Sequence, residues 1–300
     1  MQQLLAFKER SLLMKSDDPS KSLRPFRPTR LGDLVRLGRP FDGGYIVNER
    51  AVQQSDYLLS FGINDDWSFE EGFRKRRPEA EILCFDHSVS QPILREQLLQ
   101  NINSVLSARF VLGALSGNLQ GVRNKFRALK RSRHVETDFA QFVSRRNVSF
   151  YSRGVSNASS AKFFTIDEIF HLIPRPDLRE HCVFIKMDIE QYEFRVLPEL
   201  PKYFRFLTGL VVEFHDLDIL WTNFVDLMNQ LSASFVVAHL HANNFCELIP
   251  NSKTPKLLEV TLLHRDLIKA DEQELHAAVY PIPGLDQPND FEKEDYVLEL

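Results

Sequence analysis

Short apolar runs of strand length alternate with longer amphipathic stretches from Tyr57 to His264. This alternation is typical of β–α–β units, in which parallel strands form a sheet and the connecting helices cover both of its faces. The sequence therefore predicts an α/β domain with a mostly parallel seven-stranded sheet and an antiparallel edge strand. We expect the strands at residues 57–61, 81–86, 109–115, 181–188, 207–215, 234–240 and 256–264.

The domain is expected to span residues 31–300 as one unit. The polar segment 1–30 has the composition of a mobile leader or of an arm lying over the domain. Residues 31–56 are expected to form a small β unit, because Gly43 and Gly44 interrupt two short apolar stretches there. Residues 121–160 are expected to be a basic insertion, which is either a solvated helix face or a rim that attracts an anionic acceptor.

Composition narrows the class of partner. The net charge of −4 and the isoelectric point near 6.2 give no overall basic surface for a nucleic-acid backbone. No apolar run approaches the roughly 18 to 20 residues needed to span a bilayer, and charges interrupt the first residues of the chain. The three cysteines form no paired motif. We therefore expect a cytoplasmic protein without a nucleic-acid partner.

Ligands of parallel sheets bind beyond the carboxyl ends of the strands, so the residues that follow each strand are candidates for the site. Gly62 and Asn64 follow the first strand, and Ser68 is placed to cap the next helix. Asp86 follows the second strand, where it would accept both ribose hydroxyls of an adenosine or would cap the next helix. Ala114 and Leu115 follow the third and could wall an adenine ring.

The end of the fourth predicted strand gives the clearest indication of a functional site. Lys186 interrupts its apolar run, and Asp188, Glu190 and Glu193 follow it. Burying such charges at a strand end costs several kcal/mol unless they are paired or used. The fifth strand ends in Glu213 and His215, which are expected beside Asp188.

The glycine pattern distinguishes two classes of cofactor. A dinucleotide needs a glycine-rich turn that lets the backbone approach its pyrophosphate, and that fingerprint is absent. S-adenosylmethionine carries no phosphate and needs only a looser turn with acidic residues, such as Asp65 and Asp66. A final antiparallel hairpin is also usual in methyltransferase sheets and rare in dehydrogenase sheets. The sequence thus favours a Rossmann-like methyltransferase fold.

The chain resembles the FkbM family of methyltransferases from about Leu34 onward. The matching segments are DGGY at 42–45, SFGINDDWSFE at 60–70, TIDEIF at 165–170, IKMDIEQYE at 185–193, VVEFH at 211–215 and DQPND at 286–290. The resemblance implies O-methylation of a natural-product or sugar hydroxyl with S-adenosylmethionine as the donor. The chain departs from the family pattern at Gln191, where a glycine is usual, and in its first loop, where Gly62 stands alone.

Methyl transfer to a hydroxyl needs alignment of donor and acceptor and a group that removes a proton. We expect His215, Asp188 and Glu190 to be catalytic, with His215 as the base, Asp188 as the second candidate and a structural histidine as the alternative. Gly62, Asn64, Asp86, Ala114, Leu115 and Asp188 are expected to bind the cofactor.

Two questions stay open at the level of sequence. Asp188, Glu190, Glu213 and His215 could hold a divalent metal, and His239 and His241 could join them or bind the acceptor. Two other functions are also compatible with the pattern: a catalytically silent Rossmann-like module that binds a nucleotide or sugar, and a transferase that uses nucleotide sugars.

Overall fold

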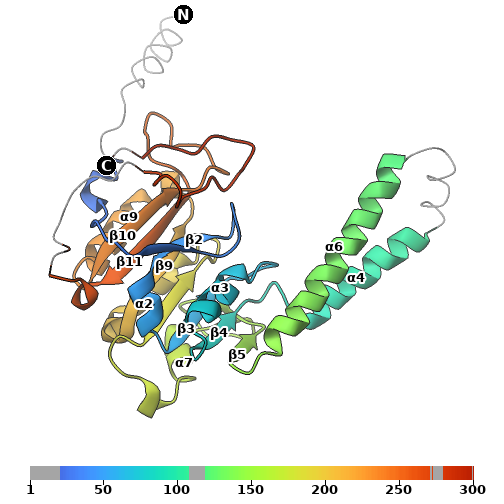
Figure 1. Cartoon of the computed structure of the whole chain (residues 1–300), viewed down its shortest axis with the longest axis horizontal. Helices are drawn as coiled ribbons and strands as arrows, with labels where there is room; N and C mark the ends of the chain where they lie inside the picture. The colour runs from blue at the N-terminus through green and yellow to red at the C-terminus, as the bar shows by residue number, and fades with distance from the viewer. Residues whose placement is uncertain (1–20, 108–118, 271, 273–279, 299) are drawn as a thin grey trace, which may run out of the picture.

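A seven-stranded sheet forms the centre of the molecule in the computed structural model, which describes residues 21–107, 119–270, 272, 280–298 and 300 (Figure 1). The strand order is β5-β4-β3-β8-β9-β11-β10, and β11 is antiparallel to both of its neighbours. The other neighbouring pairs are parallel. The predicted α/β fold with a mostly parallel seven-stranded sheet is therefore confirmed, and the antiparallel strand lies one place in from the edge. The strands are β3 (Tyr57–Phe61), β4 (Glu81–Phe85), β5 (Val148–Tyr151), β8 (Val183–Met187), β9 (Leu207–Phe214), β10 (Phe235–Ala242) and β11 (Leu258–His264).

One strand does not lie where the sequence predicts it. The expected third strand, 109–115, lies within residues 108–118, which are outside the described residues. The place beside β4 belongs to β5, in which Val148 is buried and Ser149 is exposed. This strand has only four residues, and Ser149 interrupts its apolar side chains, so its sequence gives a weak strand signal.

Helices cover both faces of the sheet, because side chains of each strand alternate between two buried clusters. Leu58, Ile82 and Phe184 face α2 (Glu49–Gln54), α3 (Ser68–Arg76) and the foot of α6 (Leu119–Val143). The intervening residues, such as Leu59 and Ile185, face α7 (Ile166–Phe170), α8 (Glu193–Val196) and α9 (Leu217–Leu231). Near-continuous apolar strands are the consequence expected of a sheet that is buried on two sides.

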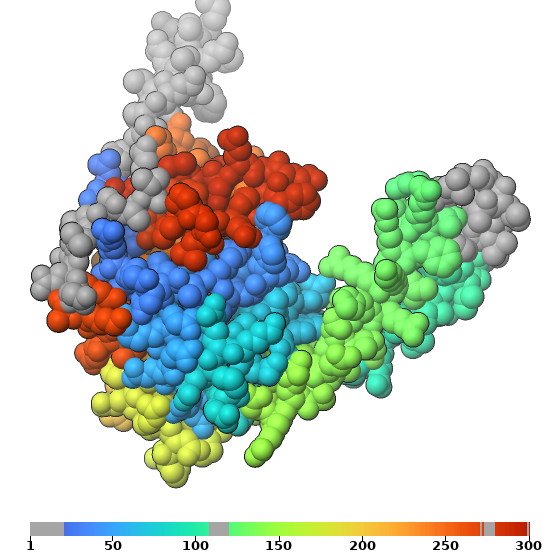
Figure 2. Space-filling view, in the orientation of Figure 1, coloured from blue at the N-terminus to red at the C-terminus, as the bar shows by residue number. Residues whose placement is uncertain are grey.

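The basic insertion is largely helical. Helix α6 packs against α4 (Gln91–Leu106), and the two helices project from the body of the molecule (Figures 1 and 2). The foot of α6 is held to the domain by Phe139 and Phe142, whose rings pack on Trp67 at centroid distances of 5.4 and 5.9 Å. Its exposed basic residues are Arg123, Arg127, Lys130, Arg131 and Arg133.

The small N-terminal β unit is a hairpin of β1 (Leu34–Leu37) and β2 (Tyr45–Asn48) that packs over β10 and β11. The Thr261 hydroxyl donates a hydrogen bond to the carbonyl of Ile46. Of the segment 1–30, only 21–30 is described, and there Leu23 and Phe26 are buried. The remaining elements are β6 (Gly154–Val155), β7 (Phe163–Phe164) and the 3-10 helices η1 (Arg24–Phe26), η2 (Arg175–Asp177), η3 (Leu197–Glu199), η4 (Pro201–Phe206) and η5 (Arg265–Leu267). No described helix combines the length and apolarity that crossing a membrane requires.

The chain leaves β3 toward β4 and later returns to β8 on the other side of β3, so the sheet has a switch point between β3 and β8. The backbones that leave these two strands meet there. Asp188 donates its N–H to the carbonyl of Phe61 at 3.0 Å. Gly62 has a φ of +75°, and a Cβ at this position would lie 1.8 Å from the carbonyl oxygen of Asp188. Only glycine fits this turn.

We predict that Gly62→Ala lowers the free energy of unfolding by about 3 kcal/mol or more, because it adds a steric overlap to an unfavourable backbone conformation. Urea denaturation measures the change. The matched control is Gly284→Ala, since Gly284 has a φ of +80° and nothing within 4 Å of its Cβ position. Gly284→Ala should lower the free energy of unfolding only by the cost of the left-handed backbone conformation, about 1–2 kcal/mol. If both variants lost the same free energy of unfolding, the steric overlap at position 62 would make no contribution of its own to the destabilisation.

Candidate functional site

A cleft of about 580 Å³ opens at the carboxyl ends of β3, β4 and β8. This is the position at which parallel α/β sheets bind their ligands, and the volume suits a small molecule. Four of the predicted site residues that follow β3 and β8 line the cleft: Gly62, Asn64, Asp188 and Glu190. Asp86, which follows β4, lines it as well.

The Asp86 carboxylate organises the loop that follows β3. One oxygen accepts the backbone N–H groups of Ile63 at 2.9 Å and Asn64 at 2.8 Å. The other accepts the N–H and the hydroxyl of Ser88, both at 2.6 Å. Burial alone would raise the pKa of Asp86, but these hydrogen bonds lower it, so the group is ionised. All four lone-pair positions of the carboxylate are engaged, and a ribose hydroxyl would bind by replacing the Ser88 hydroxyl.

Another part of the cleft lining is apolar and aromatic. Gly154 and Val155, which follow β5, line the cleft together with Phe163. The Phe163 ring stacks on Tyr192 at 5.4 Å, and a Cβ on Gly154 would lie 3.1 Å from that ring. The expected wall residues Ala114 and Leu115 lie outside the described residues. Because β5 holds the third place of this half-sheet, the described residues at the corresponding strand end are Gly154 and Val155.

Tyr45, from the DGGY segment, joins two carboxyl groups at the floor of the site. Its hydroxyl lies 3.0 Å from Asp188 Oδ2 and 2.9 Å from Glu213 Oε2. A phenol carries one proton, so it donates to one carboxylate and accepts from the other group. Asn243 donates to the second oxygen of Glu213 at 2.9 Å. The geometry therefore calls for a proton on one of the two carboxyl groups.

The surroundings of Glu213 favour its protonated form. Burial raises its pKa well above the usual value, and the neighbouring charges of Asp188 and Glu259 raise it further. With the proton on Glu213, the Tyr45 hydroxyl is free to donate to Asp188. The Asp188 side chain is 29% exposed and lines the cleft.

Lys186 places a buried positive charge beneath these groups. Its ammonium donates to the carbonyl oxygen of Gly62 and lies 3.7 Å from Asp188 Oδ2. Burial lowers the pKa of Lys186, but the charges of Asp188, Glu70 and Glu213 outweigh burial and raise it. Lys186 is therefore charged at neutral pH, and it couples the turn after β3 to the carboxylate after β8.

His215 lies beside Asp188 but is not among the residues that line the cleft. Its Nδ1 contacts the fully buried Glu193 at 3.0 Å, and its Nε2 lies 3.6 Å from Glu190 and 3.9 Å from Asp188. Burial alone would lower the pKa of His215, but Glu193, Glu213 and Asp188 together raise it to about 9. The imidazole is thus protonated at neutral pH, and a protonated imidazole does not accept a proton from a substrate.

The predicted catalytic residues form one cluster. Ligand atoms of Asp188, Glu190 and His215 all lie within 4.8 Å of one another. Glu193 fixes Nδ1 of His215 and leaves Nε2 directed at the carboxylates, the arrangement of a metal-ligating histidine with an outer partner. This donor set fits a divalent cation. Glu213, the fourth candidate, faces Tyr45 and Asn243 instead.

His239 and His241 form ion pairs away from the Asp188 cluster, mainly with the C-terminal segment. His239 contacts Asp286 at 3.1 Å, and His241 contacts Glu259 at 3.3 Å and Asp295 at 3.0 Å. Burial lowers the pKa of His241, but the two carboxylates outweigh it and raise the pKa to about 10. Both histidines therefore hold the C-terminal segment onto β10, and neither contacts the Asp188 cluster through these bonds.

Tyr45 is a residue of the candidate site whose contacts the sequence does not indicate. DGGY stands out in the sequence as a turn and as part of the family resemblance, but its contact with Asp188 spans 143 positions. The residue that departs from the family pattern, Gln191, has a φ of +76°, and Glu190 has a φ of +52°. These values explain why a glycine would be favoured at position 191.

Comparison with known proteins gives weak likenesses. No protein-family model and no curated protein matches the chain. Among solved structures, precorrin-6y C5,15-methyltransferase from Geobacter metallireducens is 12% identical, with a TM-score of 0.34, over 72% of this chain and 84% of that one. The fibrillarin pre-rRNA processing protein of Methanococcus jannaschii is 9% identical, with a TM-score of 0.35, over 79% of this chain and 87% of that one.

We predict that Glu213→Gln raises the free energy of unfolding at pH 8 and leaves it nearly unchanged at pH 4. A carboxyl group whose pKa is raised by folding releases its proton on unfolding at neutral pH, so its contribution falls as the pH rises, by about 1.4 kcal/mol for each pKa unit of the shift. Glutamine keeps a donor for Tyr45 and cannot ionise. Urea denaturation at the two pH values measures the effect.

The control is Glu190→Gln, because the Glu190 side chain is 87% exposed and should give the same small change at both pH values. If Glu213→Gln were less stable than the wild type at pH 8, Glu213 would be ionised in the folded protein and its charge would be required.

Proposed function

We propose that this protein is an S-adenosylmethionine-dependent methyltransferase of the FkbM type that methylates a hydroxyl group of a small molecule or a sugar. The observation that carries the proposal is the cleft at the switch point, where Gly62, Asp86 and Asp188 follow three neighbouring strands. This combination of a tight turn, a carboxylate after the second strand of the half-sheet and a carboxylate across the switch point suits an adenosine ligand without phosphates.

The cleft fits the cofactor in size and in chemistry. Asp86 would hold the ribose after the Ser88 hydroxyl turns away, and the wall of Gly154, Val155 and Phe163 offers an apolar face for a planar base. The carboxylate of Asp188 offers a negative partner for a cationic group. When bound, S-adenosylmethionine supplies an electrophilic methyl group.

Three residues of the cluster would act on the acceptor. Asp188 lines the cleft with a partly exposed carboxyl group, so we assign it the removal of the hydroxyl proton in place of His215, whose pKa is raised to about 9. His215 would hold the carboxylates of Asp188 and Glu190 in position through its positive charge. A divalent cation at the same three residues would have to displace the proton on His215.

The basic face of α6 supports an acceptor that carries negative charge, such as a phosphorylated or acidic sugar. Arg131 on this helix forms an ion pair of 2.6 Å with Asp65, and Asp65 lines the cleft. The helix therefore reaches the rim, where its field would raise the local concentration of an anion. We propose this class of acceptor, in the cytoplasm, ahead of nucleic acid.

A catalytically silent binding module is the second candidate. The observation in its favour is that the hydrogen-bonding capacity of Asp86 is already filled by Ile63, Asn64 and Ser88. A structural Asp86 would leave the ribose without its expected partner. Such a module would bind a nucleotide or a nucleotide sugar without turning it over, whereas a nucleotide-sugar transferase would consume one.

We predict that calorimetry detects micromolar binding of S-adenosylmethionine and S-adenosylhomocysteine to the wild-type protein. Asp86→Ala should weaken binding at least tenfold, about 1.4 kcal/mol. Ser88→Ala should leave binding unchanged or tighten it, because it removes the hydroxyl that competes for the carboxylate. This opposite behaviour of two neighbouring residues separates a direct contact with the ribose from a general loss of loop structure.

The matched control is Asp226→Ala, since Asp226 is an exposed aspartate of α9 outside the cleft. If folded wild-type protein bound neither compound but bound a uridine diphosphate sugar, the methyltransferase proposal would fail. If it bound them without methylating any phosphorylated or acidic sugar, the silent module would be the better description.

A further inference from the structure

A second cluster of potential ligands lies at the other end of the sheet. His181 precedes β8, and His264 ends β11, which runs antiparallel to its neighbours. Both residues therefore lie at the amino-terminal edge of the parallel strands. Since the chain rises about 3.3 Å per residue in a strand, His181 is roughly 20 Å from Asp188 along β8. This cluster is separate from the cleft, so any role of the cluster is independent of the function proposed for the cleft.

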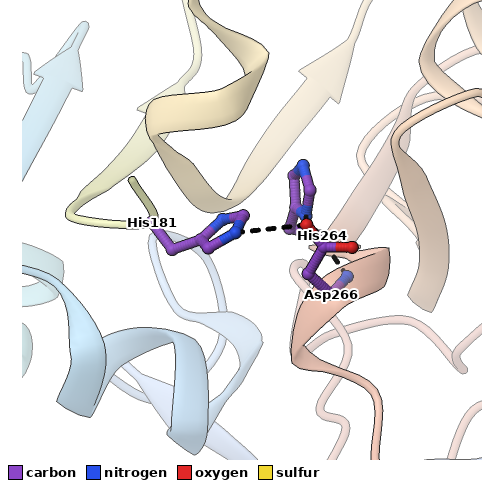
Figure 3. Close-up of side chains that lie close together, drawn as sticks. All are labelled: His181, His264 and Asp266. Atoms are coloured by element: carbon purple, nitrogen blue, oxygen red, sulfur yellow. Dashed lines mark hydrogen bonds and ion pairs between the residues drawn. The ribbon is translucent and has the colours of Figure 1, made fainter. Parts of the chain in front are cut away.

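Asp266 brings the two histidines together (Figure 3). Its Oδ2 lies 3.3 Å from His181 Nε2 and 3.6 Å from His264 Nδ1. The imidazole rings are 4.3 Å apart, and the three ligand atoms lie within 4.8 Å of one another. Ligands about 2.0–2.1 Å from a tetrahedral zinc ion lie about 3.3 Å apart, so both contacts of Asp266 already have the spacing that such an ion needs.

Hydrogen bonds orient both histidines. Nδ1 of His181 donates to the carbonyl oxygen of Leu207 at 3.2 Å, because a carbonyl only accepts. This bond directs Nε2 of His181 at Asp266. Nδ1 of His264 accepts the backbone N–H of Asp266 at 3.3 Å. The ring nitrogens that face Asp266 are thus held in place by bonds to the backbone, as is usual for histidines that bind a metal ion.

The surroundings give this cluster one open side. The side chains of His181 and His264 are 15% and 9% exposed, whereas that of Asp266 is 70% exposed. The ring of Phe235 packs against His264 at 5.2 Å. A bound ion would be held from the protein side and would take its remaining ligand from water.

We propose that His181, His264 and Asp266 form a binding site for a single transition-metal ion of the zinc class. Two imidazoles and one carboxylate are ligands suited to Zn²⁺, Co²⁺ or Ni²⁺, and three protein ligands leave a fourth position for water. Binding would replace the long hydrogen bond between the Asp266 N–H and His264. The ion would connect the start of β8 to the turn after β11, and His181 is itself bonded to β9 through Leu207.

The test is titration of the untagged, metal-free full chain with Zn²⁺ by calorimetry and with Co²⁺ by visible absorption. We expect one Zn²⁺ per chain at this cluster with micromolar affinity, and the intense visible bands of four-coordinate Co²⁺. Asp266→Ala should weaken binding at least tenfold. Because the Asp266 side chain is mostly exposed, this variant should keep its fold, and circular dichroism checks that it does.

Two further variants identify the site that the ion occupies. His215→Gln removes a ligand from the cleft cluster, and His171→Ala removes an exposed histidine that belongs to neither cluster. Both should bind Zn²⁺ as the wild type does. The proposal is overturned if the wild type binds no Zn²⁺, which would leave an ordinary ion pair, if Asp266→Ala binds it unchanged, or if only His215→Gln loses it, which would assign the ion to the cleft.

Discussion

The buried ammonium group of Lys186 is the charge around which the carboxyl end of the sheet is organised. Its charge acts on Asp188, Glu70, Glu213 and Asp86, all at or near the ends of the strands. Taking an ammonium group out of water costs several kcal/mol unless nearby opposite charges and hydrogen bonds compensate it. Here the compensation comes from three strands and a helix, and the bond to the Gly62 carbonyl fixes the turn at the switch point.

Lys186 and the neighbouring His215 face several carboxyl groups, and the surroundings divide these groups into two kinds. Hydrogen bonds lower the pKa of Asp86, whereas burial raises the pKa of Glu213 and of Glu70. Tyr45 connects Asp188 to Glu213, because its hydroxyl lies within hydrogen-bond distance of both. The N-terminal hairpin is thus part of the electrostatics of the site and not only a cover for the sheet.

The sequence pattern predicted the strands and the residues at their ends, because these depend on residues that are close together in the sequence. Strand-length apolar runs gave six of the seven strands near their observed places, and the strand ends indicated Asp86, Asp188 and His215. The third strand was predicted at 109–115, which lies outside the described residues, whereas the described strand beside β4 is the four-residue β5, which gives a weak strand signal. The base assignment to His215 depended on the ordinary pKa of an imidazole, and the approach of Glu193 that changes it is a tertiary contact. Tyr45 could not be assigned from the sequence for the same reason, since hydrogen-bond partners 143 and 168 positions away leave no periodic signal.

The packed pair α4 and α6 also bears on how this sheet can assemble. Strand β5 must find β4 across a connection of about 60 residues, and the entropy lost on closing a flexible loop grows with its length. Antiparallel packing of the two helices brings the ends of that connection together through contacts that are local in sequence. Once packed, the two helices reduce the length of flexible chain that must close before β5 can pair with β4. The rings of Phe139 and Phe142 then hold α6 against Trp67, next to these strands.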